Sequence, residues 1–293
     1  MRKFFGTAAL AVALSAVCLT GCGGGQKAAE GFDASSDITV LSREDGSGTR
    51  GAFIELFGIE EKDANGEKID HTTPDASITN STSVMMSSVA NDINAIGYIS
   101  LGSLNDTVKA VKIDGAEASA ENVANGTYGV VRPFNIVVKE DKMTPVAKDF
   151  INYIMSSDGQ TVVTDNGYIA VSEEGAFTSD NSEGKLVVGG SSSVSPVMEK
   201  LIEAYQTINT NAEIELQTTD STTGVSSTIE GTYNIGMASR ELKDTEEGVT
   251  AIKIADDGIA VIVNNDNPIE ELTSEQVLSV YTGETLTWDE LAE

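Results

Sequence analysis

The sequence is poor in cysteine, histidine and positive charge. Its 293 residues include two cysteines, one histidine and one tryptophan, and 18 lysines and arginines stand against 46 aspartates and glutamates. The formal net charge of −28 disfavours nucleic acid and anionic lipid as partners, because their phosphates would be repelled. With so few cysteines and histidines, the sequence contains no residues at the spacing of a metal-binding motif. We therefore expect neither a bound metal nor another cofactor.

The single histidine, His71, lies in the loop-like segment IDHTTPD. A phosphatase, or a serine hydrolase built around Ser47, would need a base or a metal beside its nucleophile. A lone histidine in a loop is more often incidental, and neither cysteine is available for catalysis. We therefore predict that the protein is not an enzyme.

The longest apolar run lies at the N-terminus. Two basic residues precede this run, which ends at Leu19, so residues 1–21 are predicted to be a secretory signal peptide. The segment LTGC, which ends at Cys22, resembles a bacterial lipobox and implies cleavage before Cys22 and a lipid on its thiol. The alternative is a plain signal peptide in which the cysteine occurs by chance. We expect a lipid-anchored protein on the extracytoplasmic face of the cell membrane, with no disulfide, because Cys18 would be removed with the signal.

The rest of the chain alternates β-branched runs with helical patterns, which is typical of an α/β fold. Residues 22–36 lack apolar periodicity and are predicted to be a flexible tether. The predicted strands are 38–43, 95–102, 108–113, 132–139, 185–190, 213–218, 233–239 and 258–265. Helix starts are predicted where proline or capping-box spacing occurs, at Thr144-Pro145, at Ser195-Pro196, at Thr273 with Gln276 and at Thr287 with Glu290. The predicted core includes Phe53, Phe57, Phe150, Ile151 and Ile154.

The loop SREDGSGTR, residues 42–50, joins a predicted strand to a helical pattern. It places arginines, small hydroxyl side chains and glycines where a helix begins. Because the first turn of a helix has unpaired N–H groups and a partial positive charge, such a loop suits an anion. In a chain this acidic, an anion must be held by local donors of this kind.

Two further strand-to-helix turns repeat this chemistry. They are SSSVSP, residues 191–196, and TDSTTG, residues 219–224. Ligands in α/β proteins gather at such carboxyl ends of strands. Serine and threonine are also ordinary helix caps, so one turn alone would not indicate a function. Three such turns together indicate an oxyanion site.

The segment SREDGSGTRGAF resembles the phosphate loop of the phosphate-binding proteins that serve phosphate ABC transporters. The resemblance extends over nearly the whole chain after the tether, through GGSSSVSPVMEKLIEAY, DSTTGVSSTIEGTYNIGMASREL and NAIGYISLG. It implies a two-lobed α/β fold of the periplasmic-binding-protein type (type II), with a hinge and a ligand cleft between the lobes. It also implies capture of inorganic phosphate and interaction with the membrane permease subunits of an ABC transporter. The alternative is a lipoprotein that senses phosphate or another oxyanion, or binds a partner, without a transport role.

The resemblance implies a phosphate site made from several segments. Arg43 would pair with phosphate oxygens, and Ser47, Gly48 and Thr49 would donate from side chain and backbone. The remaining binding residues would be Ser192, Ser193, Ser221 and Ser239. Asp45 would hold Arg43 in place, and Arg240 would be a second supporting residue.

One position departs from the family pattern. In some relatives an aspartate follows the strand written here as NIGMAS and accepts the proton of monohydrogen phosphate. This chain has SRE, residues 239–241, at that place. A site of donors alone would suit sulfate as well as phosphate, so an acceptor is still expected. Glu241 and a backbone carbonyl are both candidates.

The order of the segments also differs from that of the family. The family's second half corresponds to residues 38–171 and its first half to residues 185–293, so the chain resembles a circular permutation. Residues 172–184 would be the linker that joins the family's usual termini. The alternative is one piece of a tandem duplication, which would form its site within one chain or between two.

The family pattern implies crossovers between the lobes near residues 132–139 and 258–265. Lobe A would then comprise residues 130–263, and lobe B would comprise residues 37–129 plus 264–293. In this division the loop 42–50 faces the serines of lobe A across the cleft.

Overall fold

The computed structural model describes residues 31–64, 66–172 and 174–292. The predicted signal peptide, Cys22 and most of the tether lie outside the described residues. The helices are α1 (Gly48–Leu56), α2 (Thr82–Ala90), α3 (Ala120–Ala124), α4 (Pro145–Met155), α5 (Ser157–Asp165), α6 (Ser195–Ile208), α7 (Ser221–Glu230) and α8 (Ser274–Thr282). The strands are β1 (Thr39–Arg43), β2 (Glu60–Lys62), β3 (Lys68–Asp70), β4 (Ser77–Thr79), β5 (Ala95–Ser100), β6 (Lys109–Ala110), β7 (Lys112–Ile113), β8 (Val131–Val138), β9 (Gly184–Ser191), β10 (Ala212–Thr219), β11 (Ile235–Ala238), β12 (Thr250–Val263) and β13 (Glu271–Leu272).

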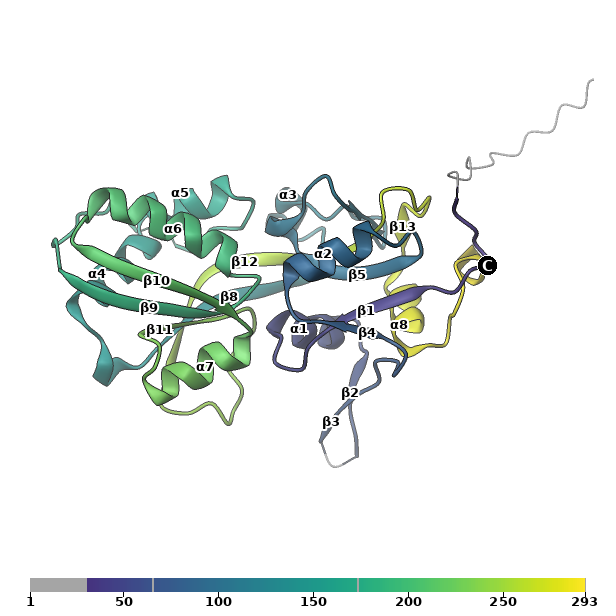
Figure 1. Ribbon diagram of the computed structural model, residues 1–293, viewed down its shortest axis with the longest axis horizontal. Helices are drawn as coiled ribbons and strands as arrows, with labels where there is room; N and C mark the ends of the chain where they lie inside the picture. Colours follow the sequence, from purple (N-terminus) through teal and green to yellow (C-terminus); the bar gives the residue numbers. More distant parts are fainter. Residues whose placement is uncertain (1–30, 65, 173, 293) are drawn as a thin grey trace, which may run out of the picture.

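One mixed sheet runs through the molecule (Figure 1). Its strand order is β10-β9-β11-β8-β12-β5-β1-β4, and β6 also pairs with β12. The strands at both ends run parallel to their neighbours, whereas β8 and β12 are antiparallel to each other. The α/β fold class predicted from the sequence is confirmed. Every helix among the described residues is too short or too polar to span a bilayer.

Local capping signals explain where several helices begin. Thr144 caps α4 through a hydrogen bond from the amide of Ala147, and Pro145 occupies the first turn as predicted. Thr273 and Gln276 form the predicted reciprocal capping box at α8. The second predicted box forms only in part. Glu290 accepts from the amide of Thr287 at 3.3 Å, but a short 3₁₀ turn follows instead of an α-helix.

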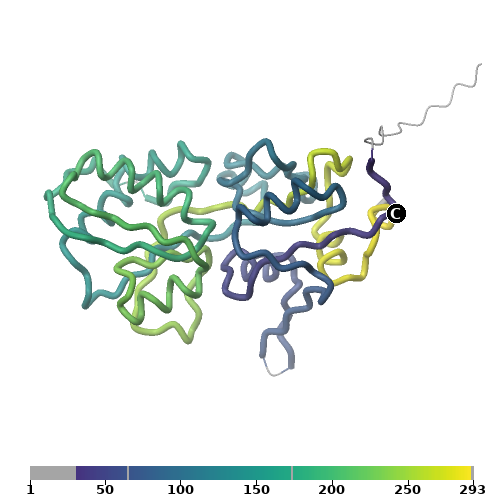
Figure 2. Tube along the Cα trace, in the orientation of Figure 1, coloured from purple at the N-terminus to yellow at the C-terminus, as the bar shows by residue number. Residues whose placement is uncertain are grey.

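The buried side chains form two large hydrophobic cores. The first core draws on residues between 38 and 130 and on residues 259–288, beneath α1, α2 and α8. The second core draws on residues between 134 and 255, beneath α4, α5 and α6. The predicted core phenylalanines and isoleucines are all buried. The molecule therefore has two halves, called here the first half and the second half after their cores (Figure 2).

Strands β8 and β12 connect the halves (Figure 1). Strand β12 pairs with β8 from Thr250 to Gly258 and with β5 from Ile259 to Val263. Its first part therefore lies in the second half of the molecule and its last part in the first half. The sequence predicted only its second part, because charged residues such as Lys253 and Asp256 interrupt the apolar pattern of the first.

A buried ion pair lies within these connecting strands. Both Nε and Nη2 of Arg132 donate to Oδ2 of Asp257, at 3.1 and 3.0 Å, and the Ser100 hydroxyl donates to Oδ1 at 2.9 Å. Burial raises the pKa of Asp257 to about 6, although Arg132 and Ser100 act to lower it. Removing either charged partner would leave the other buried and unpaired.

The two ends of the described chain lie side by side at the outer end of the first half. The amide of Ile38 donates to the carbonyl of Leu286 at 2.7 Å, and the amide of Asp289 donates to the carbonyl of Ala34 at 2.9 Å. The described residues of the segment 172–184 contain no helix and no strand before Gly184. Several hydrogen bonds attach it to the second half: Asp149 accepts from the Ser179 hydroxyl and the Asp180 amide, and Asp158 accepts from the Phe177 amide.

Candidate anion-binding site

The predicted phosphate loop folds as the sequence suggested, as the turn between β1 and α1. Ser47 is the N-cap of α1 and accepts from the amide of Arg50 at 3.3 Å. A Cβ atom on Gly48 would lie 2.5 Å from the Ser221 hydroxyl and 2.7 Å from the Ser239 hydroxyl. Glycine at position 48 thus allows the start of α1 to approach the second half closely.

Arg43 is the central cation of this region. Its side chain is 2% exposed, and its Nε and Nη2 donate to the carboxylate of Glu44 at 2.8 and 2.7 Å. Nη2 also donates to the hydroxyl of Ser192 at 3.1 Å, whereas the buried Nη1 has no hydrogen-bond partner among the described residues. A buried guanidinium with an unpaired N–H fits an anionic ligand, because arginine matches phosphate oxygens in pairs.

The backbone of Arg43 is fixed by a buried tyrosine. The hydroxyl of Tyr98 accepts from the Arg43 amide at 3.1 Å and contacts the Ser42 hydroxyl at 2.9 Å. Burial raises the pKa of Tyr98 to about 12, so it remains a neutral hydroxyl at physiological pH.

The expected support of Arg43 by Asp45 is wrong. The side chain of Asp45 is 98% exposed and pairs with Nη1 of Arg50 at 2.7 Å. Glu44 holds Arg43 instead, because its carboxylate lies against the guanidinium while the next residue along the loop points outward to α1.

The turn before α6 contributes hydroxyl groups from the second half. Ser193 Oγ lies 2.8 Å from Thr49 Oγ1, so these expected binding residues meet directly across the two halves. The Ser192 amide donates to the carbonyl of Thr219 at 3.1 Å, which ties this turn to the turn before α7.

Strand β11 and helix α7 supply the remaining serines. The Ser239 amide donates to the Ser221 hydroxyl at 3.0 Å, and the Ser191 hydroxyl donates to the Ser239 hydroxyl at 3.0 Å. Asp220 caps α7 through a bond from the Thr223 amide. The structure therefore brings the arginine, the first turn of α1 and the predicted serines into one buried cluster, called here the hydroxyl cluster.

Arg240 lies at the edge of the hydroxyl cluster. Its guanidinium is bonded to both carboxylate oxygens of Glu246, at 2.8 and 2.7 Å, and donates to the Thr222 hydroxyl at 3.3 Å. Burial acts to raise the pKa of Glu246, but the bonds from Arg240 and the Lys243 amide outweigh it and lower that pKa. Glu241, one expected proton acceptor, is exposed.

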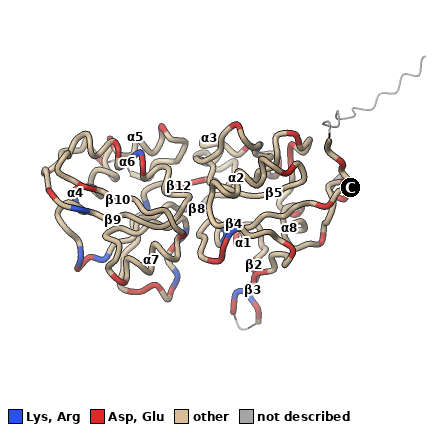
Figure 3. The backbone as a smooth tube through the Cα atoms, viewed as in Figure 1, with Lys and Arg blue, Asp and Glu red and all other residues tan. Residues whose placement is uncertain are grey.

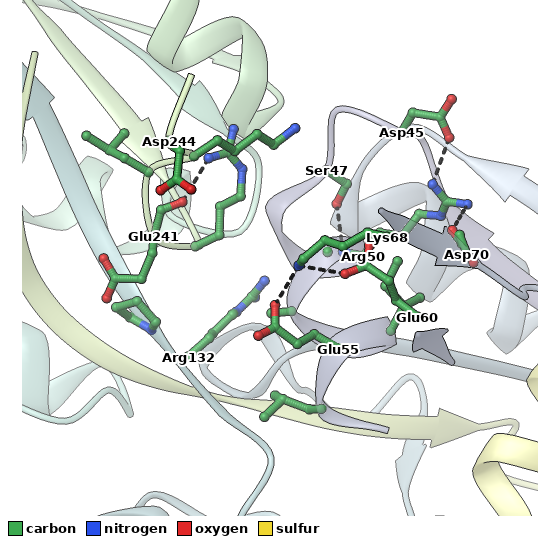
Figure 4. Close-up of a pocket in the computed structure, with 18 of the residues that line it drawn as sticks. Asp45, Ser47, Arg50, Glu55, Glu60, Lys68, Asp70, Arg132, Glu241 and Asp244 are labelled. Carbon is green, nitrogen blue, oxygen red and sulfur yellow. Dashed lines mark hydrogen bonds and ion pairs between the residues drawn. The ribbon is translucent and has the colours of Figure 1, made fainter. Parts of the chain in front are cut away.

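A cleft of about 820 Å³ opens beside the hydroxyl cluster, and both halves contribute to its walls. Figure 4 shows Arg50 and Lys68 on one wall and Glu241 and Asp244 on the other. Arg50 pairs with Asp70 at 2.6 Å, and Lys68 pairs with Glu60 at 2.6 Å, so the cations of this wall are neutralised locally.

Figure 3 shows acidic residues spread over both halves, so the surface provides no cationic field to attract an anion. Among the described residues, no group of three or more His, Cys, Asp or Glu side chains is placed to hold a metal.

Sequence reasoning missed Thr82, Ser191 and Glu44 in this region. Thr82, the first residue of α2, lies 3.3 Å from the Ser193 hydroxyl. The signal was present in the segment TNSTS, which repeats the small hydroxyl residues of the other turns. It was overlooked because the preceding strand, β4, is only three residues long and its Ile78 is exposed.

Comparisons with known proteins agree with this architecture. The PBP superfamily domain matches residues 26–158 and 175–293. "Phosphate-binding protein PstS 2" of Streptococcus agalactiae serotype V is 54% identical over 257 residues, which cover 87% of this chain and 88% of that protein. The protein of the same name from Streptococcus pneumoniae serotype 4 is 47% identical over 283 residues, which cover 96% of each chain.

A solved structure agrees as well. The crystal structure of a phosphate ABC transporter, phosphate-binding protein from Streptococcus pneumoniae TIGR4 matches with a TM-score of 0.69 at 47% identity, covering 87% of this chain and all of that one. The resemblance inferred from the phosphate loop and the two-lobed fold that it implied are thereby confirmed. The chain belongs to the PBP superfamily and, within it, to the family of the PstS phosphate-binding proteins.

Proposed function

We propose that the protein captures inorganic phosphate outside the cytoplasm and delivers it to the permease subunits of a phosphate ABC transporter. The observation that carries this proposal is the buried Arg43 of the hydroxyl cluster: its Nη2 donates to Ser192, and its Nη1 has no hydrogen-bond partner among the described residues. The same ligand and partner are supported by the relatives, which are named as phosphate-binding proteins and, for the Streptococcus pneumoniae structure, as the phosphate-binding protein of a phosphate ABC transporter.

The proposed site uses the predicted residues. Arg43 neutralises charge on the anion, while Ser47, Gly48 and Thr49 donate from the start of α1. Donors from the opposite side come from Ser192, Ser193, Ser221 and Ser239. Hydroxyls of the two halves already lie within hydrogen-bond distance of one another, so an anion between them would bond to both. Such an arrangement couples binding to the closing of one half on the other.

Domain organisation and segment order are part of the proposal. We assign lobe A to residues 130–263 and lobe B to residues 37–129 plus 264–293. The division of the two cores supports this except at the crossovers, where Val130 and residues 259–263 pack in the core of the first half. The adjacency of the chain ends and the loop at 172–184 support a circular permutation. A lipid on Cys22 would attach the protein to the extracytoplasmic face of the membrane.

Calorimetric titration tests the proposal. Residues 23–293 would be purified, stripped of bound anion, and titrated with phosphate and then with sulfate at neutral pH. We expect one phosphate per chain and little or no binding of sulfate. A folded protein that does not bind phosphate would refute the proposed function. A chromogenic phosphate ester, added in parallel, should not be hydrolysed.

A further inference from the structure

Thr82 lies in the hydroxyl cluster although no expected binding residue comes from α2. Its side chain is 6% exposed, and its Oγ1 lies 3.3 Å from Ser193 Oγ and 3.5 Å from Ser192 Oγ. Thr49, an expected binding residue, contacts the same Ser193 at 2.8 Å. Thr82 and Thr49 therefore occupy comparable places, each on the first half and each facing a serine at the start of α6.

The hydroxyl of Thr82 is not needed to cap its own helix. Ser81 is the N-cap of α2, and its hydroxyl accepts from the amide of Val84 at 3.3 Å. Thr82 follows as the first helical residue, where the backbone N–H groups have no partner within the helix. Its side chain and the first turn of α2 thus form a donor group that the helix itself does not use.

The position of Thr82 is fixed relative to Arg43. The amide of Glu44 donates to the carbonyl of Thr79 at 3.0 Å, and the Thr79 hydroxyl donates to the carbonyl of Ser42 at 3.1 Å. These bonds join the end of β4, just before α2, to the end of β1. Arg43 itself reaches Ser192, the serine that also faces Thr82.

An independent observation points to a ligand at this place. Nη1 of Arg43 is buried and unpaired among the described residues, on a side chain that is 2% exposed. A buried N–H without a partner is costly, so a strong acceptor close to it is favoured. Arg43, Thr49 and Thr82 all face the serine pair Ser192-Ser193, and an acceptor among them would lie within reach of the Thr82 hydroxyl.

We propose that Thr82 is an additional phosphate-binding residue, which donates its hydroxyl to the anion from the first turn of α2. The inference rests on the proposed function. It makes α2 a fourth helix whose N-terminus faces the ligand, after α1, α6 and α7, and each adds partial positive charge to a protein of strongly negative net charge.

Three variants test this role. Thr82→Val keeps the shape of the side chain and removes only the hydroxyl, Thr82→Ser restores the hydroxyl, and Ser83→Ala removes an exposed hydroxyl from the same turn as a matched control. Phosphate affinity would be measured by calorimetry, and thermal unfolding would be measured without phosphate. We expect Thr82→Val to weaken phosphate binding at least tenfold, Thr82→Ser to bind within about threefold of the original chain, and Ser83→Ala to bind like it. All three should unfold at the original temperature.

The outcomes separate the possible failures. A Thr82→Val variant that binds phosphate as the original chain does would overturn the inference and leave the proposed function intact. Equal losses in Thr82→Val and Thr82→Ser, together with a lower unfolding temperature, would mean that the residue is structural and would also overturn it. An original chain that is folded and binds no phosphate would refute the proposed function, and the inference with it.

Discussion

Gly48→Ala is expected to weaken phosphate binding while leaving helix α1 intact. The backbone φ of Gly48 is not in the left-handed region, and alanine is a better helix former than glycine by up to about 1 kcal/mol. The added methyl group, however, would lie 2.5 Å from the Ser221 hydroxyl, 2.7 Å from the Ser239 hydroxyl and 3.1 Å from Cγ of Arg240. The helix tolerates the change, whereas the contact with the second half does not.

The size of the effect follows from these distances. Normal contacts of a methyl group begin at about 3.4 Å, so the opposing serines would have to retreat by nearly 1 Å. Overpacking of this kind costs about 1–3 kcal/mol. If the halves separate when phosphate leaves, the clash is relieved in the free protein, and the whole cost falls on binding. We therefore expect phosphate affinity to fall roughly 5- to 150-fold.

Calorimetry would measure the phosphate affinity of Gly48→Ala, and thermal unfolding without phosphate would measure the stability of the free protein. Gly51→Ala is the matched control, because it lies in the same helix and its added methyl group would meet no described atom within 4 Å. We expect Gly51→Ala to bind like the original chain and to be as stable or slightly more stable. If Gly48→Ala binds phosphate with unchanged affinity, the close contact of α1 with Ser221 and Ser239 is not part of the bound state.

Three further changes are expected to have distinct effects. Arg43→Ala should weaken phosphate binding at least tenfold, or about 1.4 kcal/mol, by calorimetry, and an unchanged affinity would remove Arg43 from the site. Tyr98→Phe should lower the free energy of unfolding in urea by about 1–3 kcal/mol, because the buried Arg43 amide loses its acceptor, and a neutral result would contradict that bond. Asp257→Asn should destabilise the fold by about 3–5 kcal/mol, because the buried Arg132 loses the carboxylate that pairs with it. The pKa of Asp257 is raised to about 6, so between roughly pH 4 and 6 the Asp257 carboxyl is protonated in the folded chain and ionised in the unfolded chain. Stability should therefore fall as pH rises through that window in the original chain but not through this group in Asp257→Asn, as urea unfolding at several pH values would show.

Signals that act over a few residues were readable from the sequence. The capping box of Thr273 and Gln276, the proline at the start of α4 and the turn before α7, which Asp220 caps, each depend on neighbours in the chain. Their chemistry is local, so their spacing was sufficient to predict them. The same holds for the loop at residues 42–50.

Features that depend on distant partners were not readable. The sequence does not show that Glu44, and not Asp45, faces Arg43, because both carboxylates lie within two residues of Arg43 and the fold of the loop decides their directions. The first part of β12 looks too charged for a buried strand, yet Asp257 is satisfied by Arg132, 125 residues away in sequence. The proposed role of Thr82 depends on its distance from Ser193, which only the folded chain defines.

The joined chain ends determine which half would be fixed to the membrane. Ala34 and Ile38 bond to residues near the C-terminus, at the end of the first half that lies farthest from the second half (Figure 1). A lipid on Cys22 would therefore hold the first half, with Arg43 and α1, close to the bilayer. In a chain that began near Lys185, the anchor would hold the half that carries α6 and α7. If the segment order is permuted as proposed, the permutation would thus exchange the stationary and the moving half in the proposed closing motion.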